Sequence, residues 1–182
     1  MVREPTIYDL VLYGDPVLET PAKPVTKFDA ELRELVEDMF ATMYMAHGVG
    51  LAAPQIGVSM RISVIDVSFK EDPEAKIVII NPEIIHKEGK QTGPEGCLSL
   101  PDFREDVTRA ARVTVRAQDA SGKQFEMSGE DLLARAFQHE IDHLNGILFI
   151  QHLSALKRDL IKRKIRKLIR AGEWTWHAPS PQ

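Results

Sequence analysis

Two histidines and a glutamate form a metal-binding pattern in the second half of the chain. Residues 138–146 are QHEIDHLNG, in which His139, Glu140 and His143 make the pattern His-Glu-x-x-His. On a helix, residues four apart lie about one turn apart, so both imidazoles can bind one metal ion. Glu140 lies about 100° from His139 around the helix and can take a proton from a water molecule at the metal. A catalytic metal normally has three protein ligands and one open position, so a third ligand is expected elsewhere.

The third ligand could lie downstream or upstream of this pair. A metzincin protease would need Gly and His at fixed later positions, which LNGILFIQHL lacks. Few other later residues could serve: His152, Asp159, Glu173 and His177. Upstream, Cys97 lies in GPEGCLSLP, a context that predicts a loop or strand end from which a thiolate could reach a metal. The alternatives are a small buried cysteine and a pair of hydrogen-bonded helix histidines.

The elements that must position these residues include both helices and strands. Apolar residues at helical spacing predict a helix over 28–48, with Asp29 as its N-cap and Gly48 as its stop. Segments 60–67 and 75–85 are rich in β-branched residues and predict strands.

The metal motif falls on a helix that follows a predicted hairpin. Residues 111–129 alternate around Asp-Ala-Ser-Gly, which is typical of a hairpin. Ser128 is the expected N-cap of the next helix, Asp131 lies in its first turn, and Asn145-Gly146 ends it. Because strands and helices do not alternate regularly, the pattern favours an α+β fold.

Length and composition indicate one globular domain without disulfides. A chain of 182 residues with 43% hydrophobic and 27% charged residues suits a single core. The single cysteine excludes an internal disulfide and favours a reducing, cytoplasmic location. The first 25 residues are not expected to form a signal or transit peptide, because acids and prolines interrupt their apolar positions, and no apolar run in the sequence is long enough to span a membrane.

A strongly basic segment lies near the C-terminus. Residues 153–170 contain eight Lys/Arg and one acid, Asp159, so they carry a charge of +7 and the rest of the chain carries −11 to give −4. The segment is predicted to form a helix with an apolar stripe at Leu156, Leu160, Ile165, Leu168 and Ile169. Its charge indicates either a solvated face or a polyanionic partner. Residues 171–182 are expected to form a flexible tail, although its two tryptophans could pack back on the body.

Three segments together resemble the peptide deformylases. They are GVGLAAPQ (48–55), EGCLS (95–99) and QHEIDHLNG (138–146), and they match that family's three motifs in order. The opening YGDPVLETPAKPV is also similar, so the resemblance covers all but the last dozen residues. It implies one catalytic domain over 1–170 that includes the basic helix 153–170. The expected fold is α+β, with antiparallel β-sheets packed around a central helix that carries the metal motif, and a separate C-terminal helix.

The resemblance implies a metal-dependent hydrolase. Cys97, His139 and His143 would bind one divalent metal, with Fe²⁺ expected and Zn²⁺, Ni²⁺ or Co²⁺ able to substitute. The enzyme would remove the N-terminal formyl group from formyl-methionine of nascent polypeptides and release formate. Glu140 would carry protons, and the Gln55 side-chain amide and the Leu98 backbone N–H would stabilise the oxyanion.

The resemblance and the helical spacing also suggest where the peptide lies. Val49 and Gly50 are expected to pair with its main chain as an added strand, with the glycine allowing close approach. Leu132 and Ala136 share roughly the helix face of His139 and could line the methionine pocket, or they could simply be core residues. Arg104 is expected near the substrate path.

Other charged residues have weaker assignments from the sequence. Glu95 and Arg109 are candidates for an ion pair that holds the Cys97 loop, with ordinary surface charge as the alternative. Three histidines have no expected role: His47, His86 and His152.

The expected partners are the formyl-Met nascent peptide and the ribosome surface near the tunnel exit, which the helix 153–170 would contact. Neither a membrane nor specific DNA is expected as a partner. Two other functions remain open at this point: a non-catalytic ribosome- or RNA-binding module that uses the basic helix, and a zincin-type metalloprotease.

Overall fold

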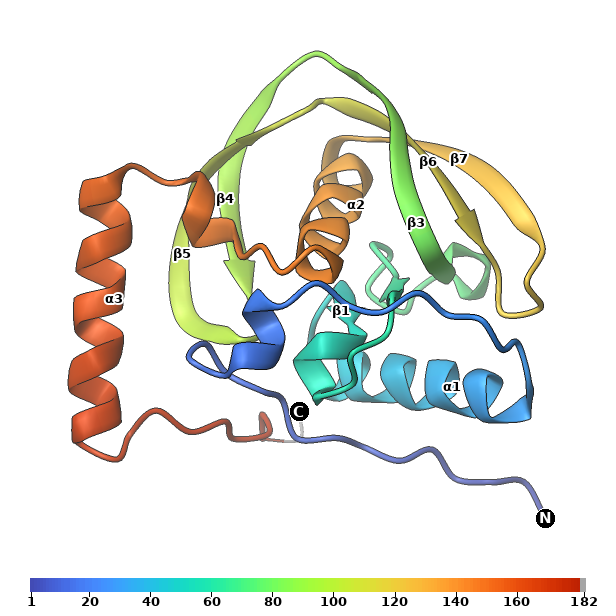
Figure 1. Cartoon of the computed structure of the whole chain (residues 1–182), viewed down its shortest axis with the longest axis horizontal. Coiled ribbons are helices and arrows are strands. Elements are labelled where there is room, and N and C mark those ends of the chain that lie inside the picture. The colour runs from blue at the N-terminus through green and yellow to red at the C-terminus, as the bar shows by residue number, and fades with distance from the viewer. Residues whose placement is uncertain (181–182) are drawn as a thin grey trace.

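Helix α2 (Asp131–Leu144), which carries the His-Glu-x-x-His motif, lies at the centre of the molecule with strands around it (Figure 1). The structure, a computed structural model, describes residues 1–180. Helix α2 contacts all five strands of one antiparallel sheet and one strand of a second, two-stranded sheet. Its apolar face, which includes Phe137 and Ile141, packs with Val113 and Val115 in one buried cluster. The predicted α+β fold is confirmed, with antiparallel sheets around the motif helix.

Two antiparallel sheets form within residues 1–180. The larger sheet has five strands in the order β1-β2-β3-β6-β7. Their bounds are Gly50–Ala52 (β1), Ile62–Ile65 (β2), Ile77–Glu88 (β3), Arg112–Gln118 (β6) and Gln124–Glu130 (β7). The smaller sheet pairs β4 (Gln91–Cys97) with β5 (Leu100–Arg109). Strand β1 therefore lies at one edge of the larger sheet.

Helix α1 (Ala30–Met45) packs against β1 and β2. Asp29 is its N-cap, as predicted, and accepts a hydrogen bond from the backbone of Leu32. Gly48 takes part in the end of the helix, since its backbone N–H donates to the Met43 oxygen at 3.0 Å, but the left-handed residue there is His47, at φ 58°. The short 3₁₀ helices are Pro16–Glu19, Ala53–Ile56, Pro73–Ala75 and Phe149–His152.

The entry to α2 differs from the prediction, whereas its end agrees. Ser128 is not the N-cap but a residue of β7, where its hydroxyl pairs with that of Thr114 at 2.7 Å. The strand continues to Glu130, which takes the N-cap position without a side-chain bond. At the other end, Gly146 has φ 76°, and a Cβ there would lie 2.9 Å from the Glu19 backbone. Only glycine allows both this conformation and this close contact.

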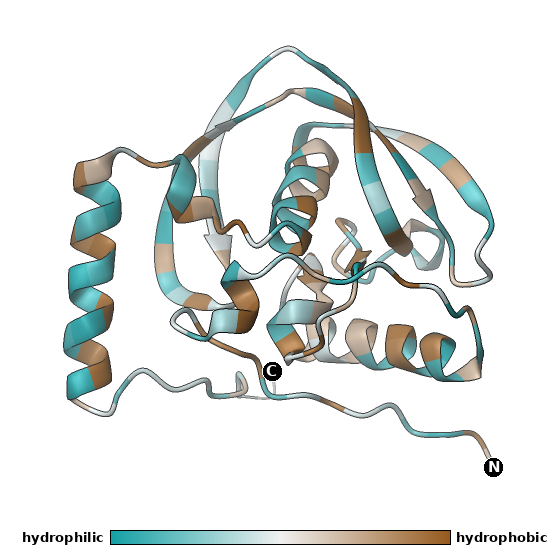
Figure 2. Cartoon of the chain, viewed as in Figure 1, coloured by the Kyte–Doolittle hydropathy of each residue, from teal (hydrophilic) through white to brown (hydrophobic). Residues whose placement is uncertain are grey.

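Helix α3 (Ala155–Arg170) stands at the side of the molecule, and its ribbon is largely hydrophilic (Figures 1 and 2). The helix is in the predicted place, but the predicted stripe is wrong in part. Leu156, Leu160 and Ile169 are 70%, 45% and 52% exposed. Ile165 is buried as predicted, and Ile161, one turn before it, is the other residue through which the helix packs into the cluster around Leu18 and Phe149.

The segment after α3 runs back along the body (Figure 1). Trp174 and Trp176 are both half-buried and pack against two different core clusters. The two tryptophans therefore pack back on the body, which was the alternative to a flexible tail. The last two residues of the predicted tail, 181–182, lie outside the described residues. Within residues 1–180, no helix is both long and apolar enough to cross a membrane.

Candidate metal centre and catalytic cleft

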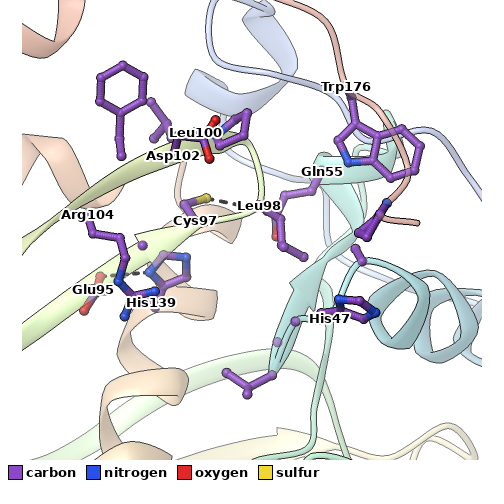
Figure 3. A pocket seen from close by; sticks show the side chains of 18 of the residues that line it. His47, Gln55, Glu95, Cys97, Leu98, Leu100, Asp102, Arg104, His139 and Trp176 are labelled. Carbon is purple, nitrogen blue, oxygen red and sulfur yellow. Dashed lines mark hydrogen bonds and ion pairs between the residues drawn. The ribbon is translucent and has the colours of Figure 1, made fainter. Parts of the chain in front are cut away.

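Cys97 lies at the end of β4, and the two motif histidines of α2 lie opposite it. Nε2 of His143 lies 3.3 Å from Sγ of Cys97 and 3.1 Å from Nε2 of His139. The ligand atoms of all three residues lie within 4.8 Å of one another. Figure 3 shows Cys97 and His139 facing the same cavity. The structure therefore brings together the three residues predicted as metal ligands.

The spacing of these atoms fits a small divalent metal. With metal–sulfur bonds of ~2.3 Å and metal–nitrogen bonds of ~2.1 Å, tetrahedral coordination separates sulfur from nitrogen by about 3.6 Å and two nitrogens by about 3.4 Å. The Cys97–His143 and His139–His143 separations, 3.3 and 3.1 Å, lie within about 0.3 Å of these values, and the third separation, between Cys97 and His139, is no more than 4.8 Å. The donor set, one thiolate and two imidazoles, suits zinc and iron alike. These three residues could hold a metal ion.

Glu95 lies at the centre of the charged groups behind Cys97, His139 and His143. Its carboxylate lies 2.8 Å from Nδ1 of His139, which leaves Nε2 of that ring free to face Cys97 and His143. Arg109 donates to both Glu95 oxygens, at 3.0 and 2.6 Å, and both side chains are only 4% exposed. Burial acts to raise the pKa of Glu95, but hydrogen bonds from His139 and Arg109 hold it well below its usual value. Glu95 is thus a buried anion that fixes the His139 ring.

The ion pair predicted between Glu95 and Arg109 belongs to a larger network. Arg135 of α2 also donates to Glu95, at 2.9 Å. Arg109 also donates a 2.6 Å hydrogen bond to the Asp142 carboxylate, which lies 2.8 Å from Nε2 of His152. The sequence alone predicts no role for His152 and does not single out Arg135 or Asp142. No local pattern could have linked them, because the network joins segments far apart in the chain.

His143 is suited to bind as a neutral ligand. Burial and the neighbouring His139 hold its pKa well below the usual value. A neutral imidazole is the form that coordinates a metal.

Glu140 lies in the same cavity, beside the ligands but outside the group that could hold the metal. Its carboxylate is 4.0 Å from Nε2 of His139 and accepts a 3.5 Å hydrogen bond from Ser63. Burial raises the pKa of Glu140 to about 7. A carboxyl group with few partners and such a pKa can both take up and release a proton near neutral pH.

Two glycines of the GVG segment make room for side chains that line the cavity. A Cβ on Gly50 would lie 2.6 Å from Oε1 of Glu140, and one on Gly48 would lie 2.7 Å from a methyl carbon of Leu98. Close approach was predicted for Gly50, but with a peptide as the neighbour. The structure adds a second reason, because the Glu140 carboxylate itself occupies the space that a side chain would need.

Gln55 and Leu98 flank Cys97. Gln55 is 1% exposed, and its Oε1 accepts a hydrogen bond from the backbone of Ala52 at 2.9 Å. This contact aims its Nε2 at Sγ of Cys97, 3.7 Å away, and at Oγ of Ser99, 3.2 Å away. Leu98 follows Cys97 in the turn between β4 and β5 and lines the cavity. The amide donor and this turn therefore lie beside the group that could hold the metal (Figure 3).

A cavity of about 1080 Å³ opens above these residues. Leu132, Ala136 and His139 line it from successive turns of α2. Val49 and Gly50 line it at the free edge of β1. Arg104 pairs with Gly96 across the small sheet, and its side chain runs over that glycine into the cavity. All five residues predicted to contact substrate therefore face one space.

Fold and site together define a class of protein, a metal-dependent hydrolase. A buried acid lies beside a Cys-His-His group in a cleft with an amide donor, which is the arrangement for activating water. The third residue of this group is Cys97, which lies upstream of the histidine pair. A zincin protease would need a third ligand downstream of the pair, and the group contains none.

Comparisons with known proteins agree with this class. The model of the family described as polypeptide deformylase matches residues 7–159. A peptide deformylase of Acidobacterium capsulatum is 67% identical over 168 residues, which are 92% of this chain and 99% of that protein. A crystal structure of the enzyme from Legionella pneumophila is 51% identical and superposes with a TM-score of 0.85, covering 92% and 98% of the two chains. A plant peptide deformylase is 35% identical over the full length of both chains, with a TM-score of 0.86.

The chain belongs to the polypeptide deformylase family. As a member, it is a metal-dependent hydrolase that removes the N-terminal formyl group from nascent peptides.

Proposed function

We propose that Cys97, His139 and His143 bind one divalent metal, with Fe²⁺ as the resident ion, and that Glu140 carries the protons of deformylation. The observation that supports this most is the convergence of the three ligand atoms beside the buried Glu140 carboxylate in a single cavity. When bound, the metal would polarise the formyl carbonyl and make a water molecule more acidic. Zn²⁺, Ni²⁺ or Co²⁺ could occupy the same position, since the donor set does not favour iron alone.

Glu140 takes the proton of the attacking water on a carboxylate oxygen and then delivers a proton to the leaving amine. Its pKa of about 7 supports both steps, because neither protonation state is strongly favoured at neutral pH. Ser63 restrains the carboxylate from one side and Gly50 leaves room for it on the other. The products are formate and a peptide with a free N-terminal methionine.

Gln55 and the backbone N–H of Leu98 are proposed to donate hydrogen bonds to the oxygen of the tetrahedral intermediate. The support is that the Gln55 amide is fixed through its own oxygen, so Nε2 is already oriented and needs no rearrangement during the reaction.

The peptide is proposed to add as a strand beside β1, with contacts from Val49 and Gly50. Strand β1 is at the edge of its sheet and faces the cavity, so a peptide main chain can pair with it. In this pose the methionine side chain lies against Leu132 and Ala136, and Arg104 lies near the path of the chain.

Substrate choice tests this function. The metal-loaded protein is expected to release formate from formyl-Met-Ala-Ser, and to leave acetyl-Met-Ala-Ser and free Met-Ala-Ser unchanged. Liberated formate and peptide fragments are measured separately, the latter by mass spectrometry. Cleavage between amino acids would indicate a protease instead, and no reaction with any peptide would contradict the proposal.

We also propose a cytoplasmic location and contact with the ribosome near the tunnel exit through α3. The exposed face of α3 supports this contact, because Arg163, Lys164, Arg166 and Lys167 are exposed there. Lys157, by contrast, forms an ion pair with Glu105 at 3.3 Å and is less free to bind phosphate.

Replacing Lys162, Arg163, Lys164, Arg166 and Lys167 with glutamine is expected to abolish co-sedimentation with ribosomes at low salt. Each neutralised phosphate adds to affinity, so binding by the parent protein should also fall steeply as salt rises. The matched control replaces five exposed cations elsewhere: Lys27, Arg33, Lys87, Lys90 and Lys123. Equal co-sedimentation of both variants would show that α3 is not the contact.

A further inference from the structure

The segment after α3 reaches the catalytic cavity from the C-terminal end of the chain. Gly172, at φ 71°, turns the chain away from the helix. Nε1 of Trp174 then donates a 2.9 Å hydrogen bond to the backbone oxygen of Tyr13. Its ring meets Phe103 edge-on, with 6.1 Å between ring centroids. Trp174 therefore anchors this segment between β5 and the N-terminal part of the chain.

The anchored segment forms part of the cavity wall. Six of its residues line the same space as Cys97 and Glu140: Glu173, Trp174, Thr175, Trp176, His177 and Pro179. Trp176 is half-buried and packs against the cluster that Leu98 also joins. In Figure 3 it lies beside Gln55 and Leu98, on the side away from His139.

The size of the cavity leaves room for more than the first residue of a substrate. At about 1080 Å³ it exceeds slightly the range of about 300–1,000 Å³ that is typical of small-ligand sites. With the formyl group at Cys97 and Glu140, the residues after methionine must run toward the mouth of the cavity. The 173–179 segment lines this same cavity.

We propose that Trp176, held in place through Trp174, forms a subsite for the side chains that follow formyl-Met and favours apolar or aromatic residues there. The inference rests on the proposed function. A tryptophan ring offers a large rigid apolar surface at little entropic cost, and pairs of aromatic rings add further attraction. The family model ends at residue 159, so this wall lies outside the part of the chain that it describes.

Steady-state kinetics with three peptides test the proposal. Formyl-Met-Ala-Ser is compared with formyl-Met-Phe-Ser and formyl-Met-Ala-Phe, with the same metal-loaded protein. The parent is expected to favour a phenylalanine peptide in kcat/KM, mainly through KM. In Trp176→Ala this preference should fall by about three- to tenfold, as the loss of an aromatic contact predicts. The preference is the ratio of two kcat/KM values measured on the same protein. A lower fraction of active enzyme changes both values equally and leaves the ratio unchanged.

The matched control is Ile85→Ala, which removes an exposed apolar side chain of β3 outside the cavity. It should keep the parent's ratios. Unchanged ratios in Trp176→Ala would overturn the inference while leaving the deformylase function intact, whereas no formate release by the parent would overturn the function itself. Faster turnover of all three peptides in Trp176→Ala would mean that the segment restricts access, and would also overturn the inference.

Fluorescence gives a second readout that does not depend on turnover. Both tryptophans of the sequence lie in this wall, so their emission reports on it. Titration of Zn²⁺-loaded Glu140→Gln protein with formyl-Met-Ala-Phe should give a saturable change in emission. The change should vanish when Trp176→Phe is added, and it should weaken when Trp174→Phe removes the hydrogen bond that holds the segment. A change that survives Trp176→Phe, or none in the starting protein, contradicts contact with Trp176.

Discussion

Glu140→Gln is expected to lower kcat for formate release by about a hundredfold to ten-thousandfold, the usual contribution of a general acid–base group. The amide has nearly the shape of the carboxylate, so it fits the space beside Gly50 and keeps a partner in Ser63. It cannot take a proton from water. The loss should therefore appear in kcat, with little change in KM.

Metal content separates this role from a structural one. Glu140 is outside the group that could hold the metal, so Glu140→Gln should still bind one equivalent by elemental analysis. Glu126→Gln, at an exposed carboxylate of β7, is the control and should keep full activity. If Glu140→Gln kept more than about a tenth of kcat, smaller than the usual general acid–base effect, another group would have to carry the protons.

Arg109→Met is expected to lower the free energy of unfolding by about 3 kcal/mol, at the lower end of the cost of breaking a buried ion pair. Arg109 neutralises the buried Glu95 through two hydrogen bonds and also binds Asp142. Without it, Glu95 keeps Arg135 as its remaining cation, which limits the loss. Urea denaturation of the metal-free protein measures the effect without the contribution of bound metal.

The matched control is Arg116→Met on β6, whose ion pairs with Glu83 and Glu126 are exposed. That variant should lose less than about 1 kcal/mol. Metal affinity should also fall in Arg109→Met and stay unchanged in Arg116→Met. Without Arg109, Glu95 holds the His139 ring less firmly, and contacts that support a ligand in this way contribute about 10- to 100-fold to metal affinity. Equal stability of the two variants would show that the buried network does not support the site.

The histidine pair and the motif helix could be predicted because their information is local, since His139 and His143 are one turn apart. Cys97 was assigned as the third ligand only through the family resemblance, because a single cysteine in a turn-forming context is also typical of a small buried residue. The hairpin over 111–129 was predictable from local information, as its strands pair across a short turn.

Features that depend on distant contacts could not be predicted in this way. Strand β4 contains glycines and a proline, and β5 contains a proline and several charged residues, so residue propensities do not indicate that these two segments pair as strands. The face of α3 that packs on the body depends on which neighbours it meets, so Ile161 was missed. The approach of Trp176 to the cavity likewise depends on the anchor of Trp174 at Tyr13, a residue near the other end of the chain.

The most direct test of the central claim is a titration of metal-free protein with Ni²⁺ under anaerobic conditions, with formate release from formyl-Met-Ala-Ser measured at each step. A single site made by Cys97, His139 and His143 predicts activity that rises linearly to one equivalent and then stays constant, and Cys97→Ala should show no such rise. Activity in Cys97→Ala equal to that of the parent, or no formate release from folded parent protein with one equivalent bound, would contradict the account.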